Sequence, residues 1–281
     1  MTTIEAPAWE DPRRVLARHG LLPKRRLSQS FLVSRHAVDA IATAAVTQPG
    51  EHVVELGPGL GTLTAALLRR GARVLAIERD PDMLRVLEQE LGPFGVELRH
   101  GDAAHVDYAE LASSLRTKPS VAGNLPYAAT GAILRNLTQH RELIARAVVM
   151  VQREVRDRLC AEPGTSDYGV LTVFTSAAFE IDTVLRLEPG AFHPPPRVKS
   201  AVVRLLPRAT PLAEETATFT TLVHAAFQRR RKMLRNALAS AFGLERSERA
   251  LAQAGIDPQR RGETLSVAEL ARLASTLERE T

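Results

Sequence analysis

The sequence predicts an α/β protein, with a doubly wound domain over residues 1–206 and a small all-helical domain over residues 207–281. Short apolar runs alternate with helical segments in the first part, which is typical of βαβ units and a parallel sheet. A glycine-rich turn follows the first run, at residues 57–61. From Pro211 onward the apolar residues recur only at helical spacing, so the sheet is expected to end before this point.

The short apolar run at residues 52–56 is expected to be a buried parallel strand, because glycines stop it. Two more strands are expected at residues 73–77, closed by Glu78, and at residues 96–100, ended by Gly101 and Asp102. Helices are expected to follow the first two at residues 62–70 and 81–91, the second starting with a proline in its first turn. The other expected elements are a helical lead-in within residues 1–22, a helix at 38–46, and strands at 145–151, 181–187 and 201–206.

The composition restricts the class of protein. Among 281 residues the net charge is +5, which favours a polyanionic partner. The single cysteine, Cys160, excludes an internal disulfide and a cysteine cluster for zinc, and no metal site is expected. No apolar run approaches the roughly 18 residues that span a membrane, and the N-terminus lacks a hydrophobic signal region. A cytoplasmic protein without a membrane partner is therefore expected.

The first candidate site is the segment from Glu55 to Gly61, between the first strand and its helix. Glycines at such a crossing let the backbone approach a bound nucleoside closely. The spacing is G-x-G-x-G, and Thr62 stands where a dinucleotide fingerprint would carry its third glycine. A cofactor without a pyrophosphate fits better than NAD, and S-adenosylmethionine is such a cofactor. A tight strand-to-helix turn without a ligand is the alternative.

Two acidic residues follow successive predicted strands. Glu78 ends the second strand, where a carboxylate can accept hydrogen bonds from ribose hydroxyls. Asp102 ends the third, where it can accept from an adenine amino group. Either could be a surface acid by itself. Together, behind a glycine loop, they favour a nucleoside site.

The segment Asn124-Leu125-Pro126-Tyr127 suits chemistry at an exocyclic amino group of adenine. The lone pair of that nitrogen is delocalised into the ring, so a catalyst helps by accepting hydrogen bonds from both of its N–H groups. The Asn124 side-chain oxygen and the Leu125 carbonyl offer two acceptors, and Pro126 holds Leu125 extended. Tyr127 offers a ring on which the base can stack. An Asn-Pro turn with a core tyrosine is the alternative.

Two further features concern the nucleic acid. Phe192, in a segment that continues to Pro196, could supply a second aromatic face for a base flipped out of its stack, although a purely structural loop is also open. Basic residues cluster at Lys24, Arg25 and Arg26, and at Arg229–Lys232, where Arg229, Arg231 and Lys232 are the candidates for phosphate contacts. The alternative for these charges is a solvated helix face.

The chain resembles the family of adenine N6,N6-dimethyltransferases that modify small-subunit ribosomal RNA, over almost its whole length. Asn124–Tyr127 and the glycine loop carry the resemblance most specifically. Further similar segments are residues 27–32, 152–155, 167–169, 192–198, 227–236 and 263–266.

The resemblance implies a Rossmann-like S-adenosylmethionine-dependent methyltransferase domain with a helical, rRNA-facing domain behind it. It implies dimethylation of two adjacent adenosines in a 3′-terminal hairpin of 16S rRNA, as part of ribosome biogenesis on an assembling small subunit, and a monomeric enzyme. Cofactor contacts are implied at Ser30, Leu32, Gly57, Glu78, Asp102 and Asn124. Position 30 departs from the family, which usually has asparagine there.

Three other functions stay open at this point. A large-subunit adenine dimethylase would share the first domain, but the segments 227–236 and 263–266 argue against it. An RNA-binding assembly factor with incidental catalysis is a second alternative, and intact Asn124 and Tyr127 speak against lost catalysis. A small-molecule methyltransferase is a third alternative, and it would not need the basic cluster at Arg229–Lys232.

Overall fold

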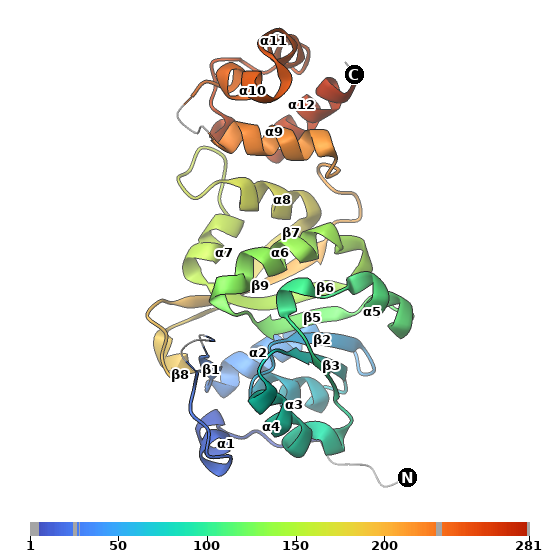
Figure 1. Cartoon of the computed structure of the whole chain (residues 1–281), viewed down its shortest axis with the longest axis vertical. Coiled ribbons are helices and arrows are strands. Elements are labelled where there is room, and N and C mark those ends of the chain that lie inside the picture. The colour runs from blue at the N-terminus through green and yellow to red at the C-terminus, as the bar shows by residue number, and fades with distance from the viewer. Residues whose placement is uncertain (1–5, 25–26, 28, 229–231, 280–281) are drawn as a thin grey trace. The chain divides into compact units, whose positions relative to one another are not determined.

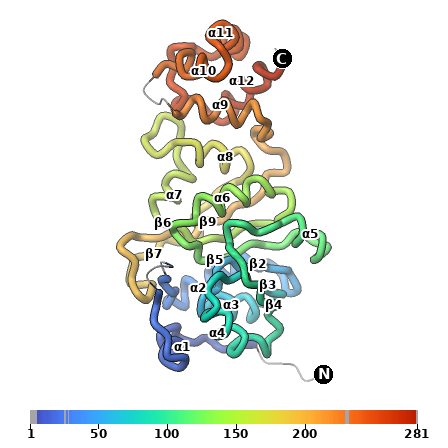
Figure 2. The backbone as a smooth tube through the Cα atoms, viewed as in Figure 1, coloured from blue at the N-terminus to red at the C-terminus, as the bar shows by residue number. Residues whose placement is uncertain are grey.

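The computed structural model describes residues 6–24, 27, 29–228 and 232–279. The chain forms two compact units (Figure 1). The first consists of Met1–Arg156 and Ile181–Pro207, and the second of Asp157–Glu180 and Arg208–Thr281. Figure 2 follows the chain as it leaves the first unit along helix α7 (Arg153–Leu159), forms α8 (Val170–Ala178) and returns along strand β7 (Phe179–Leu187).

A seven-stranded sheet in the order β4-β3-β2-β5-β6-β9-β7 is the frame of the first unit. Strands β2 to β6 are parallel, and β9 pairs with β6 antiparallel. The strands other than β7 are β2 (His52–Leu56), β3 (Arg73–Glu78), β4 (Glu97–His100), β5 (Ser120–Asn124), β6 (Arg146–Gln152) and β9 (Ser200–Pro207). The strand order reverses beside β2, and in open α/β sheets ligands bind at the carboxyl ends of the strands next to such a reversal.

Helices cover the sheet because apolar residues recur on one side of each helix. One hydrophobic cluster joins α2 and α3 to the sheet, through Ala37, Val38, Ile41, Leu63, Leu67, Val53, Val74, Ala122 and Val148. Strand residues between these, such as Val54 and Val121, are also fully buried, so both faces of the central strands β2 and β5 are covered. The helices of this unit other than α7 are α1 (Pro12–Arg18), α2 (Arg35–Ala45), α3 (Thr62–Arg69), α4 (Pro81–Leu91), α5 (Tyr108–Leu115) and α6 (Thr130–Gln139).

A separate two-stranded ribbon joins segments that are far apart in the sequence. Strand β1 (Phe31–Leu32) pairs antiparallel with β8 (Phe192–His193), and the two lie side by side in Figure 1. The backbone N–H of Val33 extends the ribbon by donating to the Ala191 carbonyl, at 2.8 Å. The ribbon therefore fixes the N-terminal segment against the loop that follows β8.

The second unit is helical. It contains α8, α9 (Ala217–Gln228), α10 (Leu234–Phe242), α11 (Leu244–Gln253) and α12 (Val267–Arg279), around one hydrophobic cluster. Ser266 and Glu269 begin α12 as a capping box, because each side chain accepts a hydrogen bond from the backbone N–H of the other. Arg260 pairs with Glu269 and holds the pKa of that carboxyl down at about 2.

The structure agrees with the predicted strands to within two residues, and with the helices at 62–70 and 81–91 to within one. The ribbon β1–β8 and helices α5 to α8 were not anticipated. The units also divide differently from the expected boundary at residue 207. Residues 157–180 belong to the helical unit, because Val173 and Phe174 of α8 pack into its hydrophobic cluster. Within the described ranges, every helix is too short or too polar to cross a lipid bilayer.

Candidate active site

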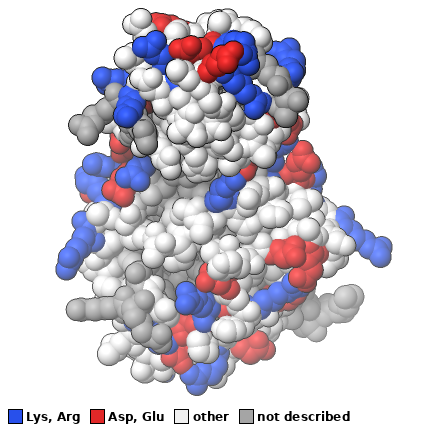
Figure 3. All heavy atoms as spheres, turned by 45° about the horizontal axis from the view of Figure 1, so that its top comes forward, with Lys and Arg blue, Asp and Glu red and all other residues white. Residues whose placement is uncertain are grey.

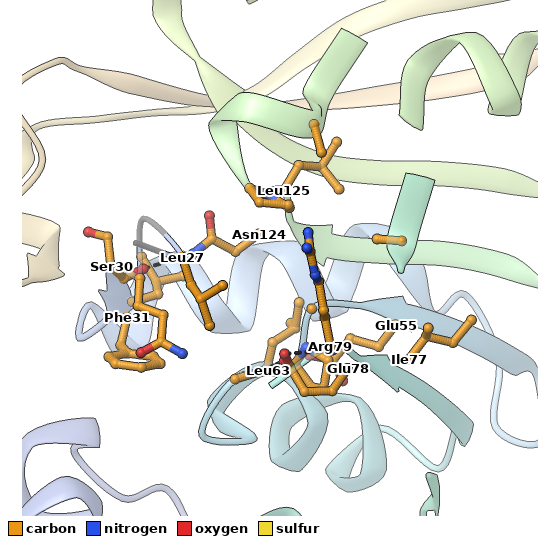
Figure 4. A pocket seen from close by; sticks show the side chains of 18 of the residues that line it. Leu27, Ser30, Phe31, Glu55, Leu63, Ile77, Glu78, Arg79, Asn124 and Leu125 are labelled. Carbon is orange, nitrogen blue, oxygen red and sulfur yellow. Dashed lines mark hydrogen bonds between the residues drawn. The ribbon is translucent and has the colours of Figure 1, made fainter. Parts of the chain in front are cut away.

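A pocket of about 230 Å³ lies at the carboxyl edge of the sheet in the first unit. Its walls come from the N-terminal segment up to Leu32, the glycine loop, the ends of β3 and β4, and the segment that begins at Asn124 (Figure 4). This is the edge where a reversal of strand order predicts a ligand site. Among the residues that the structure describes, no three His, Cys, Asp or Glu side chains are grouped to hold a metal ion.

The glycine loop has a backbone conformation and a packing that only glycine satisfies. Gly59 has a φ of +59° and Gly61 a φ of +78°, in the left-handed region that favours glycine. A Cβ atom at Gly59 would lie 3.1 Å from the Phe31 ring, and one at Gly61 would collide with Leu91. The loop therefore needs glycine for its backbone shape and for its packing.

Glu78 ties the glycine loop to the end of β3. One carboxylate oxygen accepts from the Gly59 N–H at 3.0 Å, and the other accepts from the N–H groups of Arg79 and Asp80, each at 2.8 Å. Burial raises the pKa of Glu78, and these three N–H groups oppose that shift. A carboxylate has about four lone-pair sites, so roughly one is left for a ligand hydroxyl.

Asp102 borders the pocket where β4 ends. Its Oδ1 accepts from the Ala104 N–H at 2.9 Å, and its Oδ2 lies 3.5 Å from Nη1 of Arg79. The side chain is partly exposed, so Oδ2 can still accept a hydrogen bond from a ligand.

Asn124 ends β5 and enters the pocket beside the N-terminal segment. Its Nδ2 donates to the Ser30 carbonyl at 3.0 Å, which leaves Oδ1 as the acceptor of the amide. Leu125 follows as a buried residue whose N–H donates to the Met150 carbonyl on β6, at 3.2 Å. The carbonyl of Pro126 accepts from the Ala129 N–H, so the chain turns directly after the motif.

Tyr127 presents a half-buried ring to the pocket, and its hydroxyl is anchored. The Tyr127 and Ser200 hydroxyl oxygens are 2.9 Å apart, and Ser200 is buried at the start of β9. Burial raises the pKa of Tyr127. Pairing of Ser200 with Gln152 and of Asn124 with Met150 brings these residues to the same edge of the sheet.

The expected role of Phe192 is not supported. Its side chain is only 3% exposed and packs in the cluster beneath α2, and it is not among the residues that line the pocket. The antiparallel pairing of β8 with β1 places Phe192 opposite Leu32, and both are buried there. Stacking on a flipped base would require the ring to leave this packing.

The expected RNA contact at Lys24 meets a competing interaction. Its ammonium lies 2.6 Å from Oδ1 of Asp80 and also pairs with Asp82, at the start of α4. These bonds raise the pKa of Lys24, so the charge is present but compensated. Lys232 is exposed. The other proposed phosphate contacts, Arg25, Arg26, Arg229 and Arg231, lie outside the described residues.

Two polar residues of the site were not assigned a role from the sequence. Ser200 is a polar residue directly before the apolar run Ala201–Val203, which is a usable signal. Glu55 is fully buried and lines the pocket, and burial raises its pKa to about 8, with the charge of Glu78 adding to the shift. Its Oε2 has no hydrogen-bond partner among the described residues. Its position within the glycine motif was the only signal.

The sheet order, the glycine loop and the strand-end acids define a Rossmann-like S-adenosylmethionine-dependent methyltransferase. The profile of the family "Ribosomal RNA adenine dimethylase" matches residues 21–279. The chain therefore belongs to the ribosomal RNA adenine dimethylase family. The predictions of this family, of its fold class and of the enzyme class with its cofactor are confirmed.

Similar proteins support this assignment over nearly the full chain. "Ribosomal RNA small subunit methyltransferase A" of Myxococcus xanthus is 48% identical over 95% of both chains. The protein of the same name from an Anaeromyxobacter species is 46% identical over 96% of this chain and 98% of its own. Among solved structures, the 23S rRNA methyltransferase ErmE is 28% identical, with a TM-score of 0.65 over 88% of this chain and 99% of its own. A dimethyladenosine transferase from Plasmodium falciparum is 24% identical, with a TM-score of 0.72 over 86% of this chain and 95% of its own, and it supports the fold alone.

Proposed function

We propose that this enzyme dimethylates the exocyclic N6 of two adjacent adenosines in a 3′-terminal hairpin of 16S rRNA. The observation that carries the proposal is the orientation of Asn124. Its Nδ2 is engaged by Ser30, so its Oδ1 is the end of the amide left to meet an amino group. The names of the bacterial relatives, which are 48% and 46% identical over nearly the whole chain, support small-subunit ribosomal RNA as the substrate.

The residues of the motif act on the target base. In the first transfer the Asn124 Oδ1 and the Leu125 carbonyl accept hydrogen bonds from the two N6 hydrogens, which draws the nitrogen toward tetrahedral geometry. In the second transfer only one N–H remains, and one of the two oxygens accepts from it. The Tyr127 ring stacks on the adenine, held in place by the bond from its hydroxyl to Ser200. Bound S-adenosylmethionine supplies an electrophilic methyl group on a sulfonium. No strong general base is needed, because the methylated nitrogen is itself acidic.

The cofactor is assigned to four residues that border the pocket, namely Leu32, Gly57, Glu78 and Asp102. Glu78 accepts a ribose hydroxyl with the lone-pair site that its three backbone bonds leave open. Asp102 accepts from the adenine amino group of the cofactor with Oδ2. The hydroxyl of Ser30 donates to the Pro194 carbonyl, so Ser30 is not assigned a cofactor contact through its side chain.

The RNA contacts are assigned to Arg229, Arg231 and Lys232, by their local density of positive charge. The net charge of the helical unit does not favour RNA binding there, because this unit has 13 basic and 13 acidic residues. The first unit has 24 basic and 19 acidic residues. Figure 3 supports this balance, since basic and acidic side chains are interspersed over the face it draws. The basic excess of the first unit therefore contributes to RNA attraction as well.

The setting of the reaction belongs to the same proposal. We place the enzyme in the cytoplasm, as a monomer that acts on small-subunit rRNA in an assembling small subunit. The large-subunit alternative is favoured by one observation only, the 28% identity to ErmE.

Mass spectrometry of both ribosomal RNAs, from cells with and without the gene, tests the function. Loss of two neighbouring dimethyladenosines from 16S rRNA alone is the expected result. Loss from 23S rRNA would replace the proposal with the large-subunit alternative. Unchanged methylation with defective subunit assembly would favour an assembly factor.

A further inference from the structure

Ser30 forms two hydrogen bonds that join three segments of the first unit. Its backbone carbonyl accepts from Nδ2 of Asn124 at 3.0 Å, and the two residues are neighbours in Figure 4. Its hydroxyl donates to the Pro194 carbonyl at 2.7 Å. The N-terminal segment, the end of β5 and the loop after β8 therefore meet at this one residue.

The bond to Asn124 decides which end of the amide the substrate meets. The last torsion of an asparagine side chain is broad and roughly two-fold, so it does not select one orientation by itself. An amide turned by 180° would present an NH₂ donor to the amino group of the base, and two donors repel. With Nδ2 bound to the Ser30 carbonyl, the acceptor Oδ1 is the end that remains.

The Ser30 carbonyl is itself held in position from two sides. On one side the hydroxyl bond fixes Ser30 to Pro194. On the other side the neighbouring Gln29 donates from Nε2 to Oδ2 of Asp80 at 2.7 Å. The Asp80 N–H in turn donates to the Glu78 carboxylate at 2.8 Å. Hydrogen bonds therefore connect Glu78, which is assigned to the cofactor ribose, with the side-chain amide of Asn124.

We propose that Ser30 is a positioning residue for Asn124: its hydroxyl bond to Pro194 holds its carbonyl where it selects the catalytic orientation of the amide. This inference rests on the proposed function, since the amide acts on an adenine amino group. It separates two roles that position 30 could have. A cofactor contact would set the affinity for S-adenosylmethionine, whereas a positioning residue sets the rate of methyl transfer once both substrates are bound.

The test compares Ser30→Ala and Ser30→Thr with the wild type. Ser114→Ala is a matched control, because its hydroxyl also donates to a backbone carbonyl, that of Leu111, on helix α5. For Ser30→Ala we expect kcat to fall about three- to tenfold, the range expected for one lost hydroxyl bond. The Kd for S-adenosylmethionine, measured by calorimetry, should change less than about twofold. Ser30→Thr keeps the hydroxyl and should restore kcat, and Ser114→Ala should match the wild type.

Three results would overturn the inference. A large loss of cofactor affinity with unchanged kcat at saturation would make Ser30 a cofactor contact. Unchanged kcat and Kd in Ser30→Ala would remove any role for the hydroxyl. A threonine variant as slow as the alanine variant would show that another property of serine matters.

A second measurement does not depend on turnover. In ¹⁵N spectra, the Asn124 side-chain amide, assigned from its absence in Asn124→Ala, should show one hydrogen-bonded N–H in the wild type and lose that signature in Ser30→Ala. Equal signals in both proteins would contradict the inference. If the wild type methylated no ribosomal RNA, the proposed function would fail, while this spectrum would still report on the Ser30–Asn124 bond.

Discussion

Replacing Tyr127 by phenylalanine and by alanine separates the ring from the hydroxyl. Alanine removes the stacking surface, which is worth about 1–3 kcal/mol per base, so kcat/KM should fall by about 5- to 150-fold. Phenylalanine keeps the ring but breaks the 2.9 Å bond to Ser200, whose hydroxyl is then left buried without this partner. A neutral hydrogen bond contributes about 0.5–1.5 kcal/mol, so stability should fall by about that amount and kcat/KM by less than about fivefold.

Methyl transfer from labelled S-adenosylmethionine to a hairpin RNA measures kcat/KM, and urea denaturation measures stability. Tyr108→Phe is the matched control, because the buried Tyr108 hydroxyl has no hydrogen-bond partner among the described residues. Combining Tyr127→Phe with Ser200→Ala should cost little more than either change alone, since both remove the same bond. A phenylalanine variant as inactive as the alanine variant would refute the stacking role and assign the chemistry to the hydroxyl.

Three other predictions concern the cofactor, a buried acid and the RNA. Glu78→Ala should lower the affinity for S-adenosylmethionine at least about tenfold in calorimetry, because a charged acceptor is lost. NAD should not bind the wild type, and tight NAD binding would contradict the cofactor assignment. The pKa of Glu55 is about 8 in the folded protein and lies near its ordinary, lower value in the unfolded chain, so its contribution to stability is full at low pH and is lost as pH rises toward 8. Urea denaturation should therefore show Glu55→Gln gaining stability over the wild type from about pH 5 to pH 8, and a pH-independent difference would contradict a protonated Glu55. Replacing Arg229, Arg231 and Lys232 by glutamine should weaken rRNA binding and reduce the slope of log affinity against log salt by a little under one per true contact. The same change at the exposed Arg249, Arg272 and Arg279 is the control, and a slope equal to that of the wild type in the first variant would contradict phosphate contacts at the cluster.

The parts of the fold that were predictable depend on neighbours in the sequence. The strand at 52–56, the glycine loop and the helix at 81–91 each carry a local pattern, and the acids at 78 and 102 follow from the strand ends. Residues 157–180 carry no local sign that α8 completes the core of a helical unit whose other helices begin at Ala217. That assignment depends on packing partners that are distant in sequence.

Other parts of the site were not predictable because they also depend on residues that are distant in the sequence. Strand β8 has two residues, too few for alternation to show that Phe192 faces the core. The partners of Lys24 lie at Asp80 and Asp82, so a charge that looked available for phosphate is already paired. The sequence indicated Ser30 only as a cofactor contact, because no local pattern shows a hydrogen bond to Asn124, a residue 94 positions away.

The acceptor role of Asn124 is tested most directly by the separate effects of Asn124→Ala on catalysis and on binding. A hydrogen bond that strengthens in the transition state should affect kcat far more than ground-state affinity. We expect kcat to fall about a hundredfold or more, comparable to the loss of one transition-state hydrogen bond in other enzymes. The Kd for the hairpin RNA, measured by filter binding with saturating cofactor product, should change less than about threefold. A variant that retained near-normal kcat, or that lost RNA affinity as much as kcat, would contradict the central role given to the Asn124 oxygen.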